Sequence, residues 1–283
     1  MDMKDKVALV TGVTSGVGTA TAEAIAGTGA EVFMVCRNQR KGDAVLADIK
    51  QKTGNAKLHL LVGDLAVQAD IRRVAQTFLD TGKPLHLLIN NAGVVNMQRN
   101  VTVDGIEETF AVNHLAYFLL TELLRERIVA SAPARIVSVA SNAHEFCKEI
   151  HFDDLNYEQR KYKTFEVYGH SKLANILWTR EIARQLQGTG VTANCVHPGA
   201  VRTGLGTQNG LLGKIVTKLV GPFFRSPAKG AATSVYLATS DAVEGVSGEY
   251  FYNCKKLTAK PWARDDEAAK RLWDVSKELV GLS

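Results

Sequence analysis

The chain has 283 residues, of which 46% are hydrophobic, and its formal net charge at pH 7 is +5. This length and composition allow a sizeable core, and α/β folds of this size often form one domain. Basic and acidic residues are interspersed, so the small positive charge suits anionic small molecules and gives no support to nucleic-acid binding. No linker, repeat or low-complexity tract interrupts the chain, which predicts a single domain over residues 1–283.

The four cysteines show neither a C-x-x-C spacing nor a disulfide framework, which favours free thiols in a reducing compartment. The N-terminal segment leads directly into a strand pattern, and no apolar stretch of about 20 residues occurs. We therefore expect a soluble, cytoplasmic protein without a signal or membrane-spanning segment.

Short apolar runs alternate with helical patterns along the chain. Strands are expected at 6–11, 31–36, 57–62, 85–89, 135–139, 191–196 and 248–252, and helices at 16–27, 40–52, 67–79, 105–129, 165–186, 227–239 and 267–279. This alternation predicts an α/β fold, a doubly wound parallel sheet with helices on both faces. Ligands of such sheets bind beyond the carboxyl ends of the strands.

Residues 200–225 are irregular and Gly-rich, with an apolar stretch at 211–224. We interpret the segment as a lid that closes over an apolar substrate. A membrane-binding amphipathic helix is the alternative.

A Gly-rich turn joins the first expected strand to the first helix, and its residues are candidates for phosphate binding: Gly12, Thr14, Ser15, Gly16, Val17 and Gly18. Glycines allow a sharp turn and a close approach to phosphate. The helix that follows offers free N–H groups to an anion. A tight turn without a ligand is the alternative, but its place after the first strand favours a dinucleotide.

The end of the second strand carries Arg37 and Asn38 where an NAD-binding carboxylate would stand. An arginine there can hold a 2′-phosphate through its planar guanidinium, so NADP(H) is favoured over NAD(H). A solvated surface arginine is the alternative. Asp64 and Leu65 follow the third strand, where the carboxylate can accept a hydrogen bond from an adenine amino group or cap the next helix.

Tyr168 and Lys172 lie four residues apart, which puts both on one face of a helix. A positive charge beside a phenol favours the phenolate. Lowering a tyrosine pKa from about 10 to neutrality needs roughly 4 kcal/mol of differential stabilisation. A tyrosine tuned in this way can act as a general acid or base on an alcohol or carbonyl oxygen. An exposed lysine beside a half-buried tyrosine is the alternative.

Six motifs occur in a fixed order, and together they resemble the short-chain dehydrogenase/reductase family. They are T-G-x-x-x-G-x-G at 11–18, N-N-A-G at 90–93, a lone Asn113, Ser141, Y-x-x-x-K at 168–172 and P-G-x-V-x-T at 198–203. The resemblance covers nearly the whole chain and implies an NAD(P)-binding Rossmann-fold domain.

The resemblance also implies a role for each catalytic candidate. Ser141 would hold the substrate oxygen, and Tyr168 would be the general acid/base. Lys172 would lower the tyrosine pKa and bind the nicotinamide ribose. Asn113 would hold a water that links Lys172 to solvent, although an ordinary polar helix residue is its alternative reading. Ser138 is a second candidate for the serine.

The family's cofactor contacts would fall on two further loops. Asn91, Ala92 and Gly93 would pack against the adenosine half of the cofactor. Pro198, Gly199, Val201 and Thr203 would line the nicotinamide.

The segment 142–166 resembles the insertion of the retinol dehydrogenase-like branch. The same branch carries C-R-N or C-R-D after the second strand and H-S-K-L-A-N after the tyrosine, which stand here at 36–38 and 170–175. Members of this branch commonly prefer lipophilic carbonyls or alcohols. His144, Glu145 and His151 match no ordinary zinc spacing, so no metal site is predicted.

The sequence thus predicts an NADP(H)-dependent oxidoreductase that interconverts an alcohol with its ketone or aldehyde, and that reduces a lipophilic carbonyl. Two alternatives are a non-enzymatic NADP(H)-binding regulator and a C=C reductase or epimerase on the same scaffold. The family's usual dimer surface lies on the helices at 105–129 and 165–186, so a homodimer or homotetramer is expected. The sequence does not identify the substrate.

Overall fold

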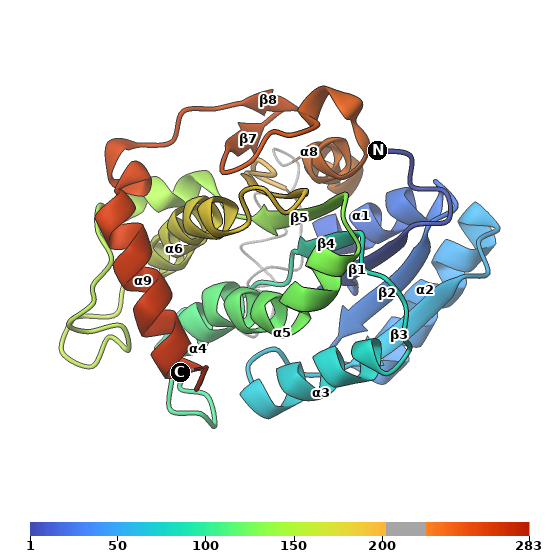
Figure 1. The fold of residues 1–283 in the computed structure, drawn as a ribbon. Helices are drawn as coiled ribbons and strands as arrows, with labels where there is room; N and C mark the ends of the chain where they lie inside the picture. The colour runs from blue at the N-terminus through green and yellow to red at the C-terminus, as the bar shows by residue number, and fades with distance from the viewer. Residues whose placement is uncertain (202–224, 283) are drawn as a thin grey trace.

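The computed structural model describes residues 1–201 and 225–282, and in this part of the chain a central sheet lies between two layers of helices (Figure 1). The eight described strands follow the order β3-β2-β1-β4-β5-β6-β7-β8. Neighbouring strands are parallel except β7 and β8. The strand order reverses between β1 and β4, where doubly wound sheets bind their ligands. The predicted fold class is confirmed.

The strands are β1 Val7–Thr11, β2 Glu31–Cys36, β3 Leu58–Val62, β4 Leu87–Asn90, β5 Ala134–Val139, β6 Val191–Val196, β7 Tyr250–Tyr252 and β8 Lys255–Lys256. The longer helices are α1 Gly16–Ala26, α2 Gln39–Thr53, α3 Gln68–Leu79, α5 Ala116–Ala130, α6 Thr164–Gln185, α8 Pro227–Thr239 and α9 Asp266–Leu279. Short helical segments are α4 Glu108–Phe110, η1 Ala111–Leu115, η2 Asn142–Phe146, η5 Asp241–Val243 and η6 Pro261–Arg264.

The predicted elements agree with these bounds to within a few residues, with two exceptions. The helix expected at 105–129 is interrupted, because η1 is a π-helix between α4 and α5. The antiparallel strand β8 was not predicted. It has only two residues, both exposed, so it carries no apolar pattern.

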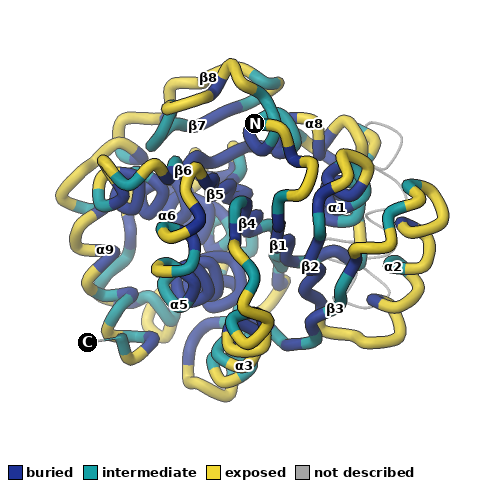
Figure 2. The backbone as a smooth tube through the Cα atoms, turned by 45° about the vertical axis from the view of Figure 1, so that its right-hand side comes forward, coloured by how far each residue is buried: buried dark blue, intermediate teal, exposed yellow. Residues whose placement is uncertain are grey.

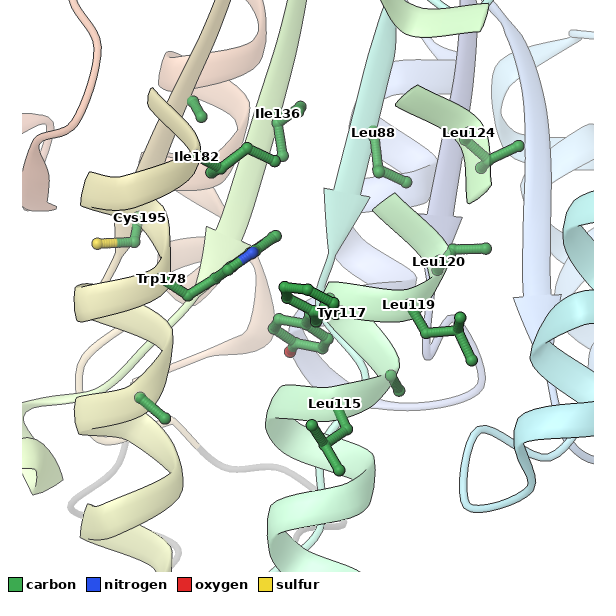
Figure 3. Packing of buried hydrophobic residues seen from close by; sticks show 14 of the residues in the cluster. Leu88, Leu115, Tyr117, Leu119, Leu120, Leu124, Ile136, Trp178, Ile182 and Cys195 are labelled. Carbon is green, nitrogen blue, oxygen red and sulfur yellow. The ribbon is translucent and has the colours of Figure 1, made fainter. Parts of the chain in front are cut away.

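Alternate side chains of β1 enter different halves of the core, as expected for a strand covered on both faces. Ala8 and Val10 pack with residues of α1, α2 and α8, whereas Leu9 packs with residues of α3, α5, α6 and α9. The residues of the sheet are therefore mostly buried, and the exposed residues lie mainly on the outer helices and loops (Figure 2). Between α5 and α6, the rings of Tyr117 and Trp178 fill the space above β4 and β5 (Figure 3).

The ends of β1 and β4 are joined by hydrogen bonds at the edge where the strand order reverses. The Thr11 hydroxyl oxygen accepts from the backbone N–H groups of Asn91 at 2.9 Å and Ala92 at 3.1 Å. The Asn91 amide donates to the carbonyls of Thr11 and Gly12. These bonds fix the Gly-rich turn against the N-N-A-G segment.

The C-terminal helix α9 lies across α5 and α6. Trp273 meets Phe118 edge-on, with ring centroids 4.9 Å apart, and Ser276 Oγ lies 2.9 Å from His114 Nε2. At the other end, Arg180 donates to Asp266 at 2.7 Å. Helix α9 thus packs along α6 and contacts α5 through Trp273.

The expected lid at 200–225 and its apolar stretch at 211–224 fall almost wholly outside the described residues. In the described part of the chain, no helix combines the length and the apolar character needed to cross a membrane. All four cysteines are free thiols, and Cys254 alone among them is partly exposed.

The close packing at the start of α1 predicts a strong effect of Gly18→Ala. A Cβ at this position would lie 2.1 Å from the Gly12 carbonyl oxygen and 2.4 Å from the Asn91 amide nitrogen. Because backbone must then shift, we expect about 1–3 kcal/mol of destabilisation in urea unfolding. Gly27→Ala at the other end of α1 is the matched control, since its Cβ would make only ordinary contacts. Equal stability of both variants would contradict this account.

Candidate active site

The side chains expected to be catalytic meet beyond the carboxyl ends of β4 and β5. Ser141 follows β5, and Tyr168 and Lys172 lie on α6. A Cβ added to Gly93 would lie 3.3 Å from Asn113 Oδ1 and 3.8 Å from Lys172 Nζ, so these two groups face the same small space. The end of β5, helix α6, the π-helix η1 and the loop after β4 thus meet at one place.

Lys172 is a buried cation without a carboxylate partner among the described residues. Its side chain is 2% exposed, and Nζ donates to the Val139 carbonyl at 2.8 Å. Nζ also lies 5.6 Å from the ring centroid of Tyr168 and 5.7 Å from that of Tyr117. Burial lowers the pKa of Lys172 to about 7. Near neutral pH its charge is therefore sensitive to any anion placed beside it.

Tyr168 differs from expectation in the direction of its pKa shift. Burial raises the pKa of Tyr168 to about 12, and a hydrogen bond with the Ser141 hydroxyl only partly opposes this. Lys172 is not among the causes of this shift, so the structure does not show the lowering of the Tyr168 pKa that was expected from Lys172. At neutral pH the phenol is protonated and able to donate.

Asn113 is held rigidly inside the π-helix η1. Its Oδ1 accepts from Val94 N–H at 2.8 Å, and its Nδ2 donates to Val94 O and to Ser171 Oγ, each at 3.0 Å. Its own backbone carbonyl accepts from Asn175 Nδ2 at 2.8 Å. Asn113 is therefore a buried residue that ties η1 to Val94 and to α6, and its expected role in holding a water stays a prediction.

Ser141 marks the start of η2, which packs tightly on α6. Its Oγ accepts from Ala143 N–H at 3.1 Å, and His144 Nδ1 contacts its carbonyl at 2.8 Å. A Cβ at Gly169 would lie 2.4 Å from the Ala143 carbonyl oxygen, so glycine is needed for this approach. Because Gly169 has no side chain, η2 can approach α6 closely, and this approach brings Ser141 near the Tyr168 phenol.

The N-terminus of α1 is available to an anion. Its N-cap residue Ser15 makes no side-chain capping bond, and its first turn carries no acidic residue. Gly16 has a φ of +56°, a backbone conformation that favours glycine. Thr14 lies in the same turn, and Val17 is buried against Val201 in a small apolar cluster.

The second-strand end carries an exposed ion pair. The Arg37 side chain is 64% exposed, and its Nη1 lies 3.5 Å from Asp64 Oδ2. Asn38 accepts from Lys41 N–H and so caps α2, while Asp64 accepts from Ala66 N–H. Leu65 is buried. An exposed pair of this kind contributes little to stability, so Arg37 can turn to another anion at small cost.

The P-G-x-V-x-T segment is described as far as Val201, and Thr203 lies outside the described residues. Pro198 and Gly199 follow β6 directly, and the φ of Gly199 is +84°. Gly199 N–H donates to His197 Nδ1 at 3.1 Å. This turn lies at the same sheet edge as the catalytic group.

These features fit a nicotinamide dinucleotide. A helix N-terminus without a side-chain cap can bind phosphate, and a buried lysine with no carboxylate partner in the described part of the chain can donate hydrogen bonds to ribose hydroxyl oxygens. Between them, the glycine-lined turn lets a ligand approach backbone closely.

Three residues of the site were missed in the sequence, because each looks like ordinary helix interior. Tyr117 donates to Ala92 O at 2.7 Å, Ser171 bridges Asn113 and Tyr168, and Asn175 bridges Asn113 and Val139. The helical spacing 168, 171, 172 and 175 was the available signal for two of them.

The family model described as short chain dehydrogenase matches residues 6–152 and 156–210. Retinol dehydrogenase 12 of Mus musculus is 46% identical over 277 residues, which cover 98% of this chain and 87% of that protein. Retinol dehydrogenase 14 of Homo sapiens is 44% identical over 296 residues, covering 99% and 88%.

Solved structures give the same result. An uncharacterised protein from Mycobacterium paratuberculosis aligns with a TM-score of 0.79 at 29% identity, covering 99% of this chain and 95% of that one. A blue fluorescent protein from a metagenomic library, solved with NADPH, aligns with a TM-score of 0.69 at 25% identity, covering 89% and 97%. The chain therefore belongs to the short-chain dehydrogenase/reductase family, in its retinol dehydrogenase-like branch, and is an oxidoreductase of that family.

Proposed function

We propose that this protein is an NADP(H)-dependent reductase that converts a lipophilic ketone or aldehyde to its alcohol. The observation that carries the proposal is the convergence of Ser141 and Lys172 on Tyr168, with Lys172 also facing Gly93 after β4. A bound nicotinamide supplies the hydride.

The protonation states support the direction of reduction. With a pKa of about 12, Tyr168 holds its proton at neutral pH and can give it to the oxygen of a carbonyl that accepts a hydride. The Ser141 hydroxyl, hydrogen-bonded to the phenol, is suited to orient that oxygen. Lys172 and the α1 N-terminus would hold the ribose and phosphates, and Asn113 would fix the position of the loop after β4.

Two observations favour a lipophilic substrate. Phe146 in η2 and Phe165 in α6 are 60% and 69% exposed, and their rings meet edge-on at 6.2 Å. They flank the segments that carry Ser141 and Tyr168. The relatives at 44–46% identity are named retinol dehydrogenases, whose named substrate is an apolar alcohol.

Tyr168→Phe tests the proposed acid. We expect the rate of NADPH oxidation with aromatic ketones and aldehydes to fall by about 10²- to 10⁴-fold, because the proton donor is lost. NADPH affinity, followed by fluorescence, should stay within a few-fold. Tyr162→Phe is the control, since that phenol contacts Glu107 and Thr109. Substantial turnover by Tyr168→Phe would remove this residue from the mechanism, and product analysis would separate carbonyl reduction from C=C reduction or epimerisation.

Arg37→Ala tests the preference for NADP(H). We expect NADPH to bind about ten- to a hundredfold more weakly, through loss of a charge-assisted hydrogen bond, while NADH affinity changes little. Arg40→Ala, at the second residue of α2 and also exposed, is the matched control. Calorimetric titration of both cofactors decides the point, and an equal loss for NADH would contradict a role for Arg37 in 2′-phosphate binding.

The expected homodimer or homotetramer needs a free surface on α5 and α6. Trp273, Ser276 and Asp266 of α9 contact these helices and the adjoining η1, so part of the expected dimer surface is already covered by the chain itself. We therefore favour a monomer. Light scattering after size-exclusion chromatography should give the mass of one chain, 30.7 kDa. Two or four times this mass would support the oligomer expected from the sequence.

A further inference from the structure

Three side chains stack on one another at the carboxyl ends of β6 and β7. The rings of His197 and Tyr252 are nearly parallel, at 18°, with centroids 4.6 Å apart. The Arg225 guanidinium carbon lies 4.9 Å from the Tyr252 ring centroid. A cation over an aromatic ring is attracted by the ring's electron density. We call His197, Tyr252 and Arg225 the edge stack.

Hydrogen bonds fix the outer member of the edge stack. Arg225 donates through Nη2 to the Tyr252 hydroxyl and through Nη1 to Asn253 Oδ1, each at 2.5 Å. Its backbone N–H donates to the Ala200 carbonyl at 2.8 Å. One residue therefore ties the end of β7 to the segment after β6.

The edge stack encloses Gly199. Gly199 N–H donates to His197 Nδ1, and a Cβ on Gly199 would lie 3.0 Å from both Cδ and Nε of Arg225. Burial, together with the charge of Arg225 and the nearby His144, lowers the pKa of His197 to about 4, and Glu145 opposes this shift weakly. His197 is therefore neutral at physiological pH, which keeps Nδ1 an acceptor.

We propose that the edge stack is a positioning device that sets the backbone turn at 198–201 against the nicotinamide half of bound NADP(H), with Tyr252 and Arg225 as its positioning residues. The inference rests on the proposed function only in taking this turn to line the nicotinamide. The turn at 198–201 contains a glycine of positive φ and no long side chain that could anchor it. Its position therefore depends on the residues that pack around it. A small displacement of a group that orients a reactant has a large effect on binding geometry and rate.

The test compares two ligands that share every phosphate. NADPH and 2′-phospho-ADP-ribose differ in the nicotinamide, so only a device acting on that half separates them. We expect Tyr252→Leu to weaken NADPH by about tenfold, since a pre-organised turn is lost, and to leave 2′-phospho-ADP-ribose within about twofold. Tyr252→Phe keeps the ring and should bind both ligands almost as the parent does. Arg225→Lys keeps the charge but loses the planar fork and should resemble Tyr252→Leu.

Tyr236→Leu is the matched control. Tyr236 lies on α8, and its ring contacts that of Phe251, the neighbour of Tyr252. Its removal should lower the Tm without changing the ratio of the two dissociation constants. Should Tyr252→Leu prove too unstable to assay, Arg225→Lys carries the test alone.

Several results would overturn the proposal. Equal weakening of both ligands in Arg225→Lys would mean that Arg225 contacts phosphate directly. Unchanged binding of both ligands by Tyr252→Leu and Arg225→Lys would remove the edge stack from cofactor binding. Reductase activity is measured in a separate experiment. With NADPH deuterated at C4 of the nicotinamide, the parent should transfer deuterium from one face of the ring, and Tyr252→Leu should transfer it from both faces. Absence of any reductase activity would count against the proposed function and leave the two-ligand comparison intact.

Discussion

A buried lysine, for which residues 1–201 and 225–282 offer no carboxylate partner, is the constraint around which this candidate active site is built. Lys172 is enclosed by a carbonyl and two aromatic rings, and burial brings its pKa to about 7. Such a group is costly to bury alone, so the site is incomplete without a ligand that brings oxygen atoms or negative charge. The nearby phenol keeps its proton for the same reason, since burial disfavours both charged forms.

The rest of the fold holds other groups rigidly around that lysine. Thr11 and Asn91 join the ends of β1 and β4, and Asn113 is locked between Val94 and Ser171. Gly169 lets η2 approach α6 so that Ser141 reaches the phenol. The contacts of Thr11 and Asn91 lie at strand ends, whereas those of Asn113, Gly169 and Ser171 lie within helices.

Much of this architecture could be predicted from the sequence. The strands β2 and β6 and the helix α8 have the bounds that their apolar patterns predict, because a strand buried on both faces reads as a continuous apolar run. The four-residue helical spacing also singled out Tyr168 and Lys172. The direction of the Tyr168 pKa shift was wrong, because desolvation depends on neighbours far along the chain, and one sequence does not give that enclosure.

Other features were out of reach for a similar reason. Tyr117 and Asn175 read as helix interior, and their role comes from the partners that the fold supplies. The contact of α9 with α5 was not predicted either, because the amphipathic pattern of α9 does not reveal which helices it packs against. The π-helix has no residue-type signature, since the same residues would suit an α-helix.

That π-helix makes the chain's length in this region as important as its composition. A π-helical segment accommodates an extra residue between two stretches of regular helix. Loss of one residue from η1 would restore a continuous α-helix and rotate the side chains on one side of the deletion by about 100° about the helix axis. Asn113 would then either leave Val94 and Ser171 or pull α5 out of its packing in the core. In this region, descendants of the protein can exchange residue types more freely than they can change the residue count.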